Sequence, residues 1–147
     1  MKRLRARGDR GSASIAVVLF ALVAMALAAF VIDGGLAISE REQAADIAEQ
    51  GARWVANDID VDKLRTDPLA VPVISGDAVD RCGDLVGGII TDSGATGTST
   101  CVFDADMREV TVTVHLQYHP MLTGLFFTGT LDVFGHATAG PQNQATP

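Results

Sequence analysis

The hydrophobic positions of this 147-residue chain fall into three successive patterns, and each predicts a different element. The first is a continuous apolar run over residues 13–32, ASIAVVLFALVAMALAAFVI, in which Ser14 is the only polar side chain. A helix of twenty residues is about 30 Å long, which matches the hydrocarbon thickness of a bilayer. A charged residue at mid-bilayer costs roughly 2.5–3.5 kcal/mol on insertion scales, so the lack of charge is informative. We therefore predict a membrane anchor from Ala13 to Ile32.

Residues 33–57 show the second pattern, in which small and apolar residues recur at helical spacing. The recurring positions are Ala37, Ala44, Ile47, Ala48, Gly51, Ala52 and Val55. Charged residues occupy the other side, so the pattern predicts an amphipathic stalk helix, with a weak point for bending at Gly34–Gly35. Two interpretations of the small-residue face remain open. It covers the chain's own domain, which is the commoner fate of such a stripe, or it receives a partner helix.

The third pattern is a strict alternation of apolar and polar residues from Arg108 to Tyr118, which predicts a strand with one buried face. The apolar set is Val110, Val112, Val114, Leu116 and Tyr118, and the polar set is Thr111, Thr113, His115 and Gln117. Cys101–Phe103 leads into this strand through the turn-like residues Asp104–Asp106, which predicts a hairpin. Thr130–Ala139 alternates again and is expected to pair beside the main strand.

Three weaker signals complete the picture. Leu69–Ile74 is a candidate edge strand, because Pro72 cannot donate a hydrogen bond to a central ladder. His119–Phe127 is apolar, and Pro120 is placed to open a short helix there. The final residues 140–147, GPQNQATP, are polar with two prolines and are expected to be disordered.

The expected fold class is α+β: an N-terminal transmembrane helix continues into an amphipathic stalk helix that packs on a small antiparallel β-sheet domain. The expected zones are a basic cytoplasmic stub (1–12), the transmembrane helix (13–32), the stalk (33–57), an extracytoplasmic β-rich domain (58–139) and the tail (140–147). A core of roughly eighty residues is small, and domains of that size usually need a disulfide or a packed helix for stability.

Flanking charge predicts the orientation in the membrane. The stub has five basic residues against one acid, a net charge of +4, whereas six basic and seventeen acidic residues follow the span, a net charge of −11. The positive-inside rule keeps the stub in the cytoplasm and exports the rest, and the stub's arginines can hold anionic lipid headgroups. Membrane lipids are therefore expected partners, and nucleic acid is not, because the acidic remainder repels phosphate.

A signal peptide is the competing interpretation of the N-terminus. Gly35-Leu36-Ala37 has small residues at the spacing of a cleavage site, which would make residues 1–37 a signal peptide and the remainder a secreted protein. Signal-peptide cores usually have about 7–15 apolar residues, fewer than the twenty found here, and the next stretch continues as a helix. These differences favour an uncleaved anchor. Either way the remaining chain is exported.

The expected export bears on the oxidation state of the two cysteines. Cys82 and Cys101 both lie beyond the span, in an oxidising compartment where a disulfide is expected, although two free thiols remain the alternative. Closing a loop of this length contributes on the order of 3 kcal/mol. The enclosed residues 83–100 are rich in Gly, Ser and Thr, so we expect a loose excursion with at most one short strand.

No catalytic, cofactor or metal site is expected. His115 and His119 are about 13 Å apart along a strand, and His136 could add at most one more ligand. The acidic pattern Asp58-x-Asp60-x-Asp62 lacks the glycine and the closing glutamate of a calcium loop. Nucleotide-binding and nucleophile-elbow motifs are also absent from the sequence. We therefore predict that the protein is not an enzyme.

Residues 10–55 resemble the N-terminus of the TadE/TadG-like proteins of tight-adherence (Flp-type) pilus assembly. Those proteins begin with Arg-Gly, cross the membrane once, leave it at an acidic residue followed by Gly, and continue in a helix with an Ala-Ala-Asp run. The matching residues here are Arg10, Gly11, Asp33, Gly34, Ala44, Ala45 and Asp46, with Gly51-Ala52 closing the helix. The closing stretch at residues 132–140, DVFGHATAG, is similar in style to the family's ending.

One position departs from the pilin-like members of that family. They carry a glutamate five residues after the cleavage-site glycine, and the corresponding position after Gly11 is Ala16. In pilin-like assemblies this glutamate is thought to pair with a neighbour's N-terminal amine, so its absence counts against filament incorporation and against processing at Gly11. The TadG-like members also lack it and are interpreted as membrane-anchored accessory proteins. This chain is more similar to that side of the family.

The resemblance implies a bitopic, non-enzymatic accessory protein of a Tad/Flp-type pilus or a related secretion system at the bacterial cell surface. Its implied partners are other pilus-assembly or secretion-system membrane proteins. A membrane-tethered cell-surface binding module is the alternative, with the β domain holding a ligand. An anchored hydrolase has no motif in its favour.

Overall fold

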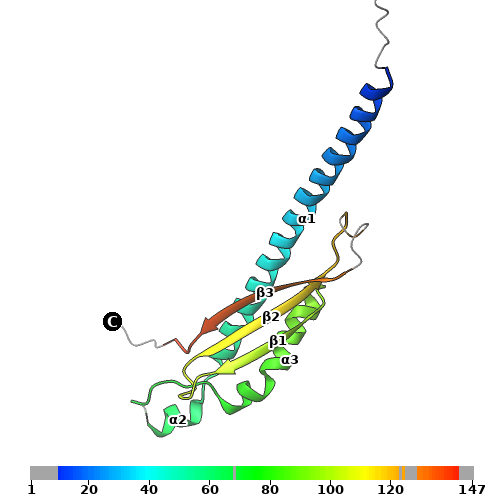
Figure 1. The fold of residues 1–147 in the computed structure, drawn as a ribbon. Coiled ribbons are helices and arrows are strands. Elements are labelled where there is room, and N and C mark those ends of the chain that lie inside the picture. The colour runs from blue at the N-terminus through cyan, green and yellow to red at the C-terminus, as the bar shows by residue number, and fades with distance from the viewer. Residues whose placement is uncertain (1–9, 68, 123, 125–128, 143–147) are drawn as a thin grey trace, which may run out of the picture.

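The computed structural model describes residues 10–67, 69–122, 124 and 129–142 (Figure 1). The elements in chain order are α1 (Arg10–Asn57), α2 (Val61–Thr66), α3 (Gly76–Asp92), β1 (Gly97–Phe103), β2 (Val110–Tyr118) and β3 (Leu131–Ala139). The three strands form one sheet, and its connections leave α1 and α3 on the same side.

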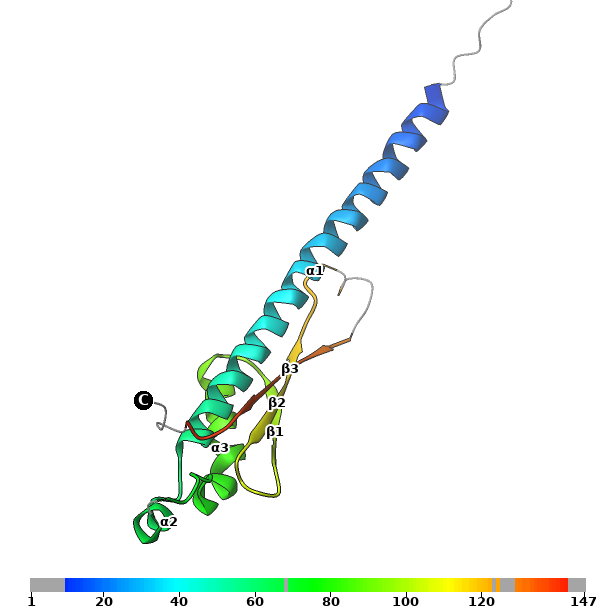
Figure 2. The same cartoon turned by 90° about the vertical axis from the view of Figure 1, so that its left-hand side faces the viewer.

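Helix α1 is continuous over 48 residues, so the predicted membrane segment and the predicted stalk are one element. The helix passes through Gly34 and Gly35 without a break (Figure 2). The helix continues through both glycines, although glycine lowers helix stability relative to alanine. The half of α1 that packs on the domain is therefore continuous with the apolar half.

The sheet has the order β1-β2-β3, and both pairs of strands are antiparallel. Val112 in the middle strand lies opposite Cys101 on one side and Ala137 on the other. The apolar residues of β2 are all buried, as the alternation from Arg108 to Tyr118 predicts. The predicted hairpin and the predicted third strand are both present, and β1 begins four residues earlier than its Cys101 start in the sequence pattern.

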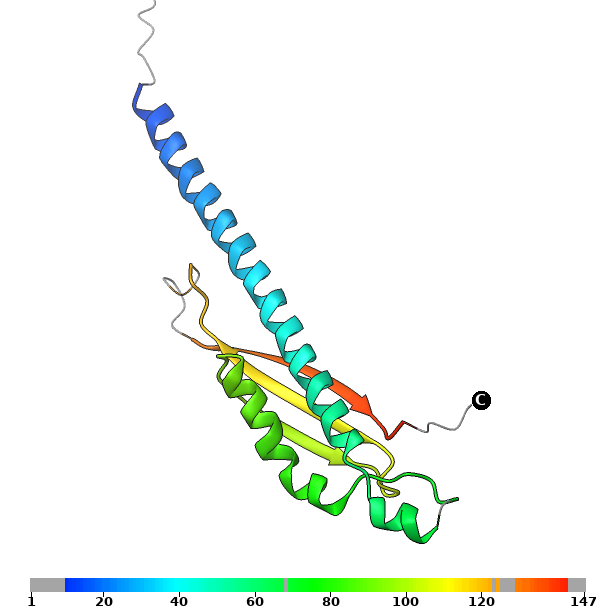
Figure 3. The same cartoon turned by 180° about the vertical axis from the view of Figure 1, so that it is seen from behind.

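Two layers make up the domain. The lower half of α1 and the whole of α3 lie side by side on one face of the sheet (Figure 3), and α1 packs mainly on β2 and β3. The core between the layers includes Val55, Val86, Val112 and Leu116, all with fully buried side chains. The α+β prediction, with a stalk helix packed on a small antiparallel sheet, is confirmed.

The prediction for residues 83–100 was wrong, because most of this segment is helical. Ser75 caps α3 by accepting a hydrogen bond at Oγ from the backbone N–H of Ala78, at 3.1 Å. Ala78, Cys82, Val86 and Ile90 then recur every four residues and are all buried. Burial of this stripe outweighs the weak helix propensity of the segment's glycines.

The weaker strand and helix predictions also differ from the structure. Within the described part of residues 69–74, pairing is limited to a single bridge between Ile59 and Ile74, while Leu69 is almost fully exposed. No α-helix forms over the described residues 119–122, and most of the remaining predicted helix lies outside the described residues. Likewise, only residues 140–142 of the predicted tail are described, and they have no regular structure.

Asp104 shapes the turn between β1 and β2. Its carboxylate oxygen Oδ1 accepts hydrogen bonds from the backbone N–H groups of Glu109, at 2.9 Å, and Arg108, at 2.6 Å. These bonds, chiefly the one from Glu109, favour the charged carboxylate and lower the pKa of Asp104 below its usual value of 3.8. The turn predicted from Asp104–Asp106 therefore has a specific side-chain lock.

Candidate functional site

The apolar half of α1 projects away from the domain. Apart from half-buried Ala29, the side chains from Ala13 to Ile32 are exposed, including Phe20 and Val31 at 74% and 70%. By length and composition, α1 is the one helix among the described residues able to cross a membrane, and its most apolar window has a mean hydropathy of 3.1. In water, an exposed apolar surface of this size would mark an association site. In a bilayer, the lipid chains would cover it.

The packed half of α1 buries the small-residue face predicted for the stalk. Ala44, Ala48 and Ala52 are completely buried against the sheet and α3. The interpretation in which this face covers the chain's own core is therefore confirmed. Of the other Ala-Ala-Asp residues, Ala45 and Asp46 have exposed side chains.

Gly135 in β3 allows α1 to come this close to the sheet. A Cβ atom built on Gly135 would lie 2.5 Å from the carbonyl carbon of Ala44 and 2.5 Å from the Cα of Ala45. Real Cβ atoms essentially never approach backbone this closely. The sequence analysis did not select Gly135, although a glycine inside an alternating strand is a recognised signal of close backbone approach.

Asp33 marks the point where the two halves of α1 meet. Its side chain is buried, and Oδ1 accepts hydrogen bonds from the backbone N–H groups of Met121 and Leu122, both at 3.2 Å. The second oxygen lies 3.3 Å from the Leu122 nitrogen. The acidic residue that the family resemblance selects thus ties the connection between β2 and β3 to the helix. Nothing in the sequence indicates these hydrogen bonds, because Met121 and Leu122 follow Asp33 by 88 and 89 residues.

The remaining family-motif residues are spread along α1. Helix α1 begins at Arg10, followed by Gly11. Gly34 is exposed beside Asp33, and a Cβ atom there would meet nothing within 4 Å. Gly51 is different, because a Cβ atom there would lie 2.8 Å from Cγ2 of Val86 in α3. The glycine that closes the motif therefore sets the distance between the two helices.

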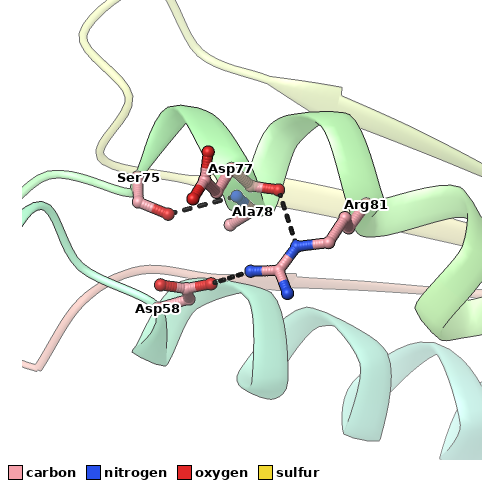
Figure 4. Close-up of polar contacts among 5 residues, drawn as sticks. All are labelled: Asp58, Ser75, Asp77, Ala78 and Arg81. Carbon is pink, nitrogen blue, oxygen red and sulfur yellow. Dashed lines mark hydrogen bonds and ion pairs between the residues drawn. The ribbon is translucent and has the colours of Figure 1, made fainter.

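Polar contacts fix the start of α3 to the end of α1 (Figure 4). Arg81 donates from Nη2 to the Asp58 carboxylate at 3.2 Å and from Nε to the backbone oxygen of Asp77 at 3.2 Å. The backbone N–H of Ser75 also donates to the Asp58 carbonyl, at 2.8 Å. Both side chains of the Arg81–Asp58 pair are largely exposed, so the ion pair itself contributes little, and its role is to orient the helix ends.

Cys82 in α3 and Cys101 in β1 are brought together at disulfide-bonding distance. Their Cα atoms are 6.4 Å apart, and the side chain of Cys82 is buried in the core. A bond here would join the helix layer to an edge strand of the sheet. The pair therefore has a structural position, in which Cys82 is shielded from solvent and Cys101 is half-buried.

The histidines and the acidic cluster do not converge. His115 and His136 are exposed on the open face of the sheet, and the described residues contain no group of three or more His, Cys, Asp or Glu side chains that could hold a metal ion. Asp60 caps α2 by accepting from the backbone N–H of Lys63 at 3.1 Å, and Asp58 pairs with Arg81. Asp62 pairs with Arg65 at 3.8 Å, so all three members of the Asp58-x-Asp60-x-Asp62 pattern have structural partners.

A groove with a volume of about 800 Å³ lies between α1 and α3. Trp54 and Ile89 lie among polar and charged residues in its lining, and no catalytic arrangement is assembled there. The features that stand out among the described residues are therefore the helix α1 and its packing and polar contacts.

Comparison with known proteins agrees with this emphasis on α1. Residues 11–58 match the family model described as putative Flp pilus-assembly TadE/G-like, and this segment nearly coincides with the helix. No curated protein and no solved structure matches the chain. The match does not separate TadE-like from TadG-like members. The resemblance predicted from Arg10 to Val55 is confirmed by this match, and the similarity to the TadE/G-like Flp pilus-assembly family extends over residues 11–58, about a third of the chain.

Proposed function

We propose that the protein is a single-pass, membrane-anchored accessory component of a Tad/Flp-type pilus or a related secretion system, without catalytic activity. One observation carries the proposal: the family segment at residues 11–58 coincides with a helix whose first half is exposed and apolar and whose second half builds the domain core. Such a helix joins a lipid-embedded surface to an exported domain. Its partners are membrane lipids and other membrane proteins of the assembly.

The anchor comprises Ala13 to Ile32, with the N-terminus in the cytoplasm and the C-terminal domain outside. The +4 charge of the stub and the −11 charge of the remainder support this orientation. The continuity of α1 also disfavours the signal-peptide alternative. Cleavage after Ala37 would cut the helix about two turns before Ala44, the first fully buried residue of the core.

Orientation is tested with single-cysteine variants and a membrane-impermeant maleimide on spheroplasts. We expect Met107→Cys, at the turn between β1 and β2, to be labelled in intact spheroplasts, because that turn is exposed on the exported domain. Lys2→Cys is the matched control and is expected to react only after permeabilisation. The reverse pattern would refute the orientation.

A role in pilus assembly is tested by deleting the gene. Normal piliation of the deletion strain would favour the alternative, a cell-surface binding module.

N-terminal processing gives a separate prediction. Without a carboxylate at Ala16, a new amine at Ser12 would lack its counter-ion within the membrane, so we expect the stub to be retained. N-terminal sequencing of the purified protein should therefore find no chain beginning at Ser12, and the protein should stay in the membrane fraction when pili are sheared off. As a comparison, Ala16→Glu restores the pilin-like carboxylate. A wild-type chain that begins at Ser12 would instead place the protein with the pilin-like members of the family.

A further inference from the structure

The connection between β2 and β3 lies at a defined depth along α1. The apolar run ends at Ile32, and twenty helical residues are about as long as the hydrocarbon core is thick, so Asp33 falls at the membrane boundary. The backbone nitrogens of Met121 and Leu122 are 3.2 Å from Asp33 Oδ1. The start of the connection therefore lies at that same boundary, beside the helix (Figure 2).

The side chains presented at this depth are apolar. Met121 is 76% exposed, so it adds little to the packing of the domain, and Leu122 is half-buried. The sequence of residues 119–130 contains no Asp, Glu, Lys or Arg, although acidic residues outnumber basic ones by eleven in the chain after the span. Residues 119–130 themselves thus lack the negative charges that anionic headgroups would repel.

The hydrogen bonds to Asp33 give the segment the property that an approach to lipid requires. Backbone N–H groups that enter the apolar part of a membrane must have partners, because no water is there to replace them. The Asp33 carboxylate supplies partners for two successive N–H groups while its own side chain is buried. A contact made only to stiffen the domain would not explain why the methionine beside it faces outward.

We propose that the segment Pro120–Leu122, positioned by Asp33, inserts Met121 into the lipid surface and forms a second membrane contact of the exported domain. This inference rests on the proposed function, since it requires α1 to span the bilayer. The exposed side chain of Met121 then contacts lipid and not another protein. The contact fixes how the sheet faces the membrane, because α1 and the connection then meet the surface at two separate points.

Depth-dependent fluorescence quenching tests the proposal on the full chain, reconstituted in vesicles of phosphatidylcholine and phosphatidylglycerol with spin-labelled lipids. Bimane is attached to Met121→Cys, and Met107→Cys is the matched control at the opposite end of the sheet (Figure 1). We expect at least twofold stronger quenching at residue 121 than at residue 107, together with a blue-shifted emission. Equal quenching at the two positions would overturn the proposal.

A third probe separates this failure from failure of the anchor itself. Leu22→Cys lies in the exposed apolar half of α1 and should be quenched by lipids that carry the spin label deep in the acyl chain. If residue 22 is quenched but residue 121 is not, the anchor holds and the second contact is wrong. If residue 22 is not quenched, the membrane-spanning role of α1 fails, and the second contact fails with it.

The positioning role of Asp33 has its own variant. Asp33→Ala in the Met121→Cys background removes the acceptor for both N–H groups, so we expect the twofold excess of quenching at residue 121 to be lost. Asp46→Ala is the control, because Asp46 is an exposed acid on the same helix. Unchanged quenching in Asp33→Ala, with the Met107 probe also unchanged, would show that Asp33 does not set the depth of the segment.

Discussion

Replacing Gly135 with valine is expected to lower the free energy of unfolding by about 3 kcal/mol, the upper end of the usual cost of overpacking. The side chain would have to occupy the space of the α1 backbone, since even a Cβ atom would lie 2.5 Å from the carbonyl carbon of Ala44. Backbone cannot move aside as a flexible side chain can, so the helix must separate from β3. Urea titration of the detergent-solubilised chain, followed by the fluorescence of its single tryptophan, Trp54, measures the effect.

Gly88→Ala in α3 is the matched control. A Cβ atom on Gly88 would meet nothing within 4 Å, and alanine is favoured over glycine in a helix interior by roughly 0.5–1 kcal/mol. This variant should be slightly more stable than the parent chain. If Gly135→Val leaves the unfolding midpoint where it was, the close contact between α1 and β3 is wrong, and with it the main packing of the fold.

Loss of the pair Cys82 and Cys101 is expected to cost about 3 kcal/mol of stability, the chain-entropy value for a loop of roughly twenty residues. The double variant Cys82→Ala/Cys101→Ala removes the bond without leaving an unpaired thiol. Unfolding of the parent chain should become easier in reductant, and unfolding of the double variant should be insensitive to it. Alanine also removes the buried sulfur of Cys82, so the comparison with the reduced parent chain separates the bond from this packing loss.

Alkylation decides independently whether the bond exists. Both thiols should resist alkylation in denatured, unreduced protein and react only after reduction. Full modification without reductant would show two free cysteines and would leave α3 held to β1 by packing alone.

The parts of the fold that the sequence predicts well are those with long, regular patterns. Helix α1 follows from the apolar run and the small-residue repeat, and β2 follows from nine alternating residues. Both patterns repeat over enough residues that a few atypical residues do not hide the period. β3 is predicted to within one residue at its start for the same reason.

Helix α3 could not be predicted in the same way. Gly83, Gly87 and Gly88 lower its intrinsic helix propensity, and its buried positions include a cysteine and an alanine that carry little hydrophobic signal. The helix exists because the sheet and α1 bury one side of it, and this contribution is tertiary. The contact of Asp33 with Met121 is beyond local reasoning for the same reason, since it joins segments 88 residues apart.

The unbroken course of α1 has a mechanical consequence. From Asp33 to Asn57 the helix is about 37 Å long at 1.5 Å per residue, and its last three turns are embedded in the domain core. If the apolar half of α1 tilted by about 10°, this stretch would tilt with it. Its far end would then move by roughly 6 Å, given its length at 1.5 Å per residue. A membrane protein that binds the apolar half of α1 would thereby move the packed domain without contacting it.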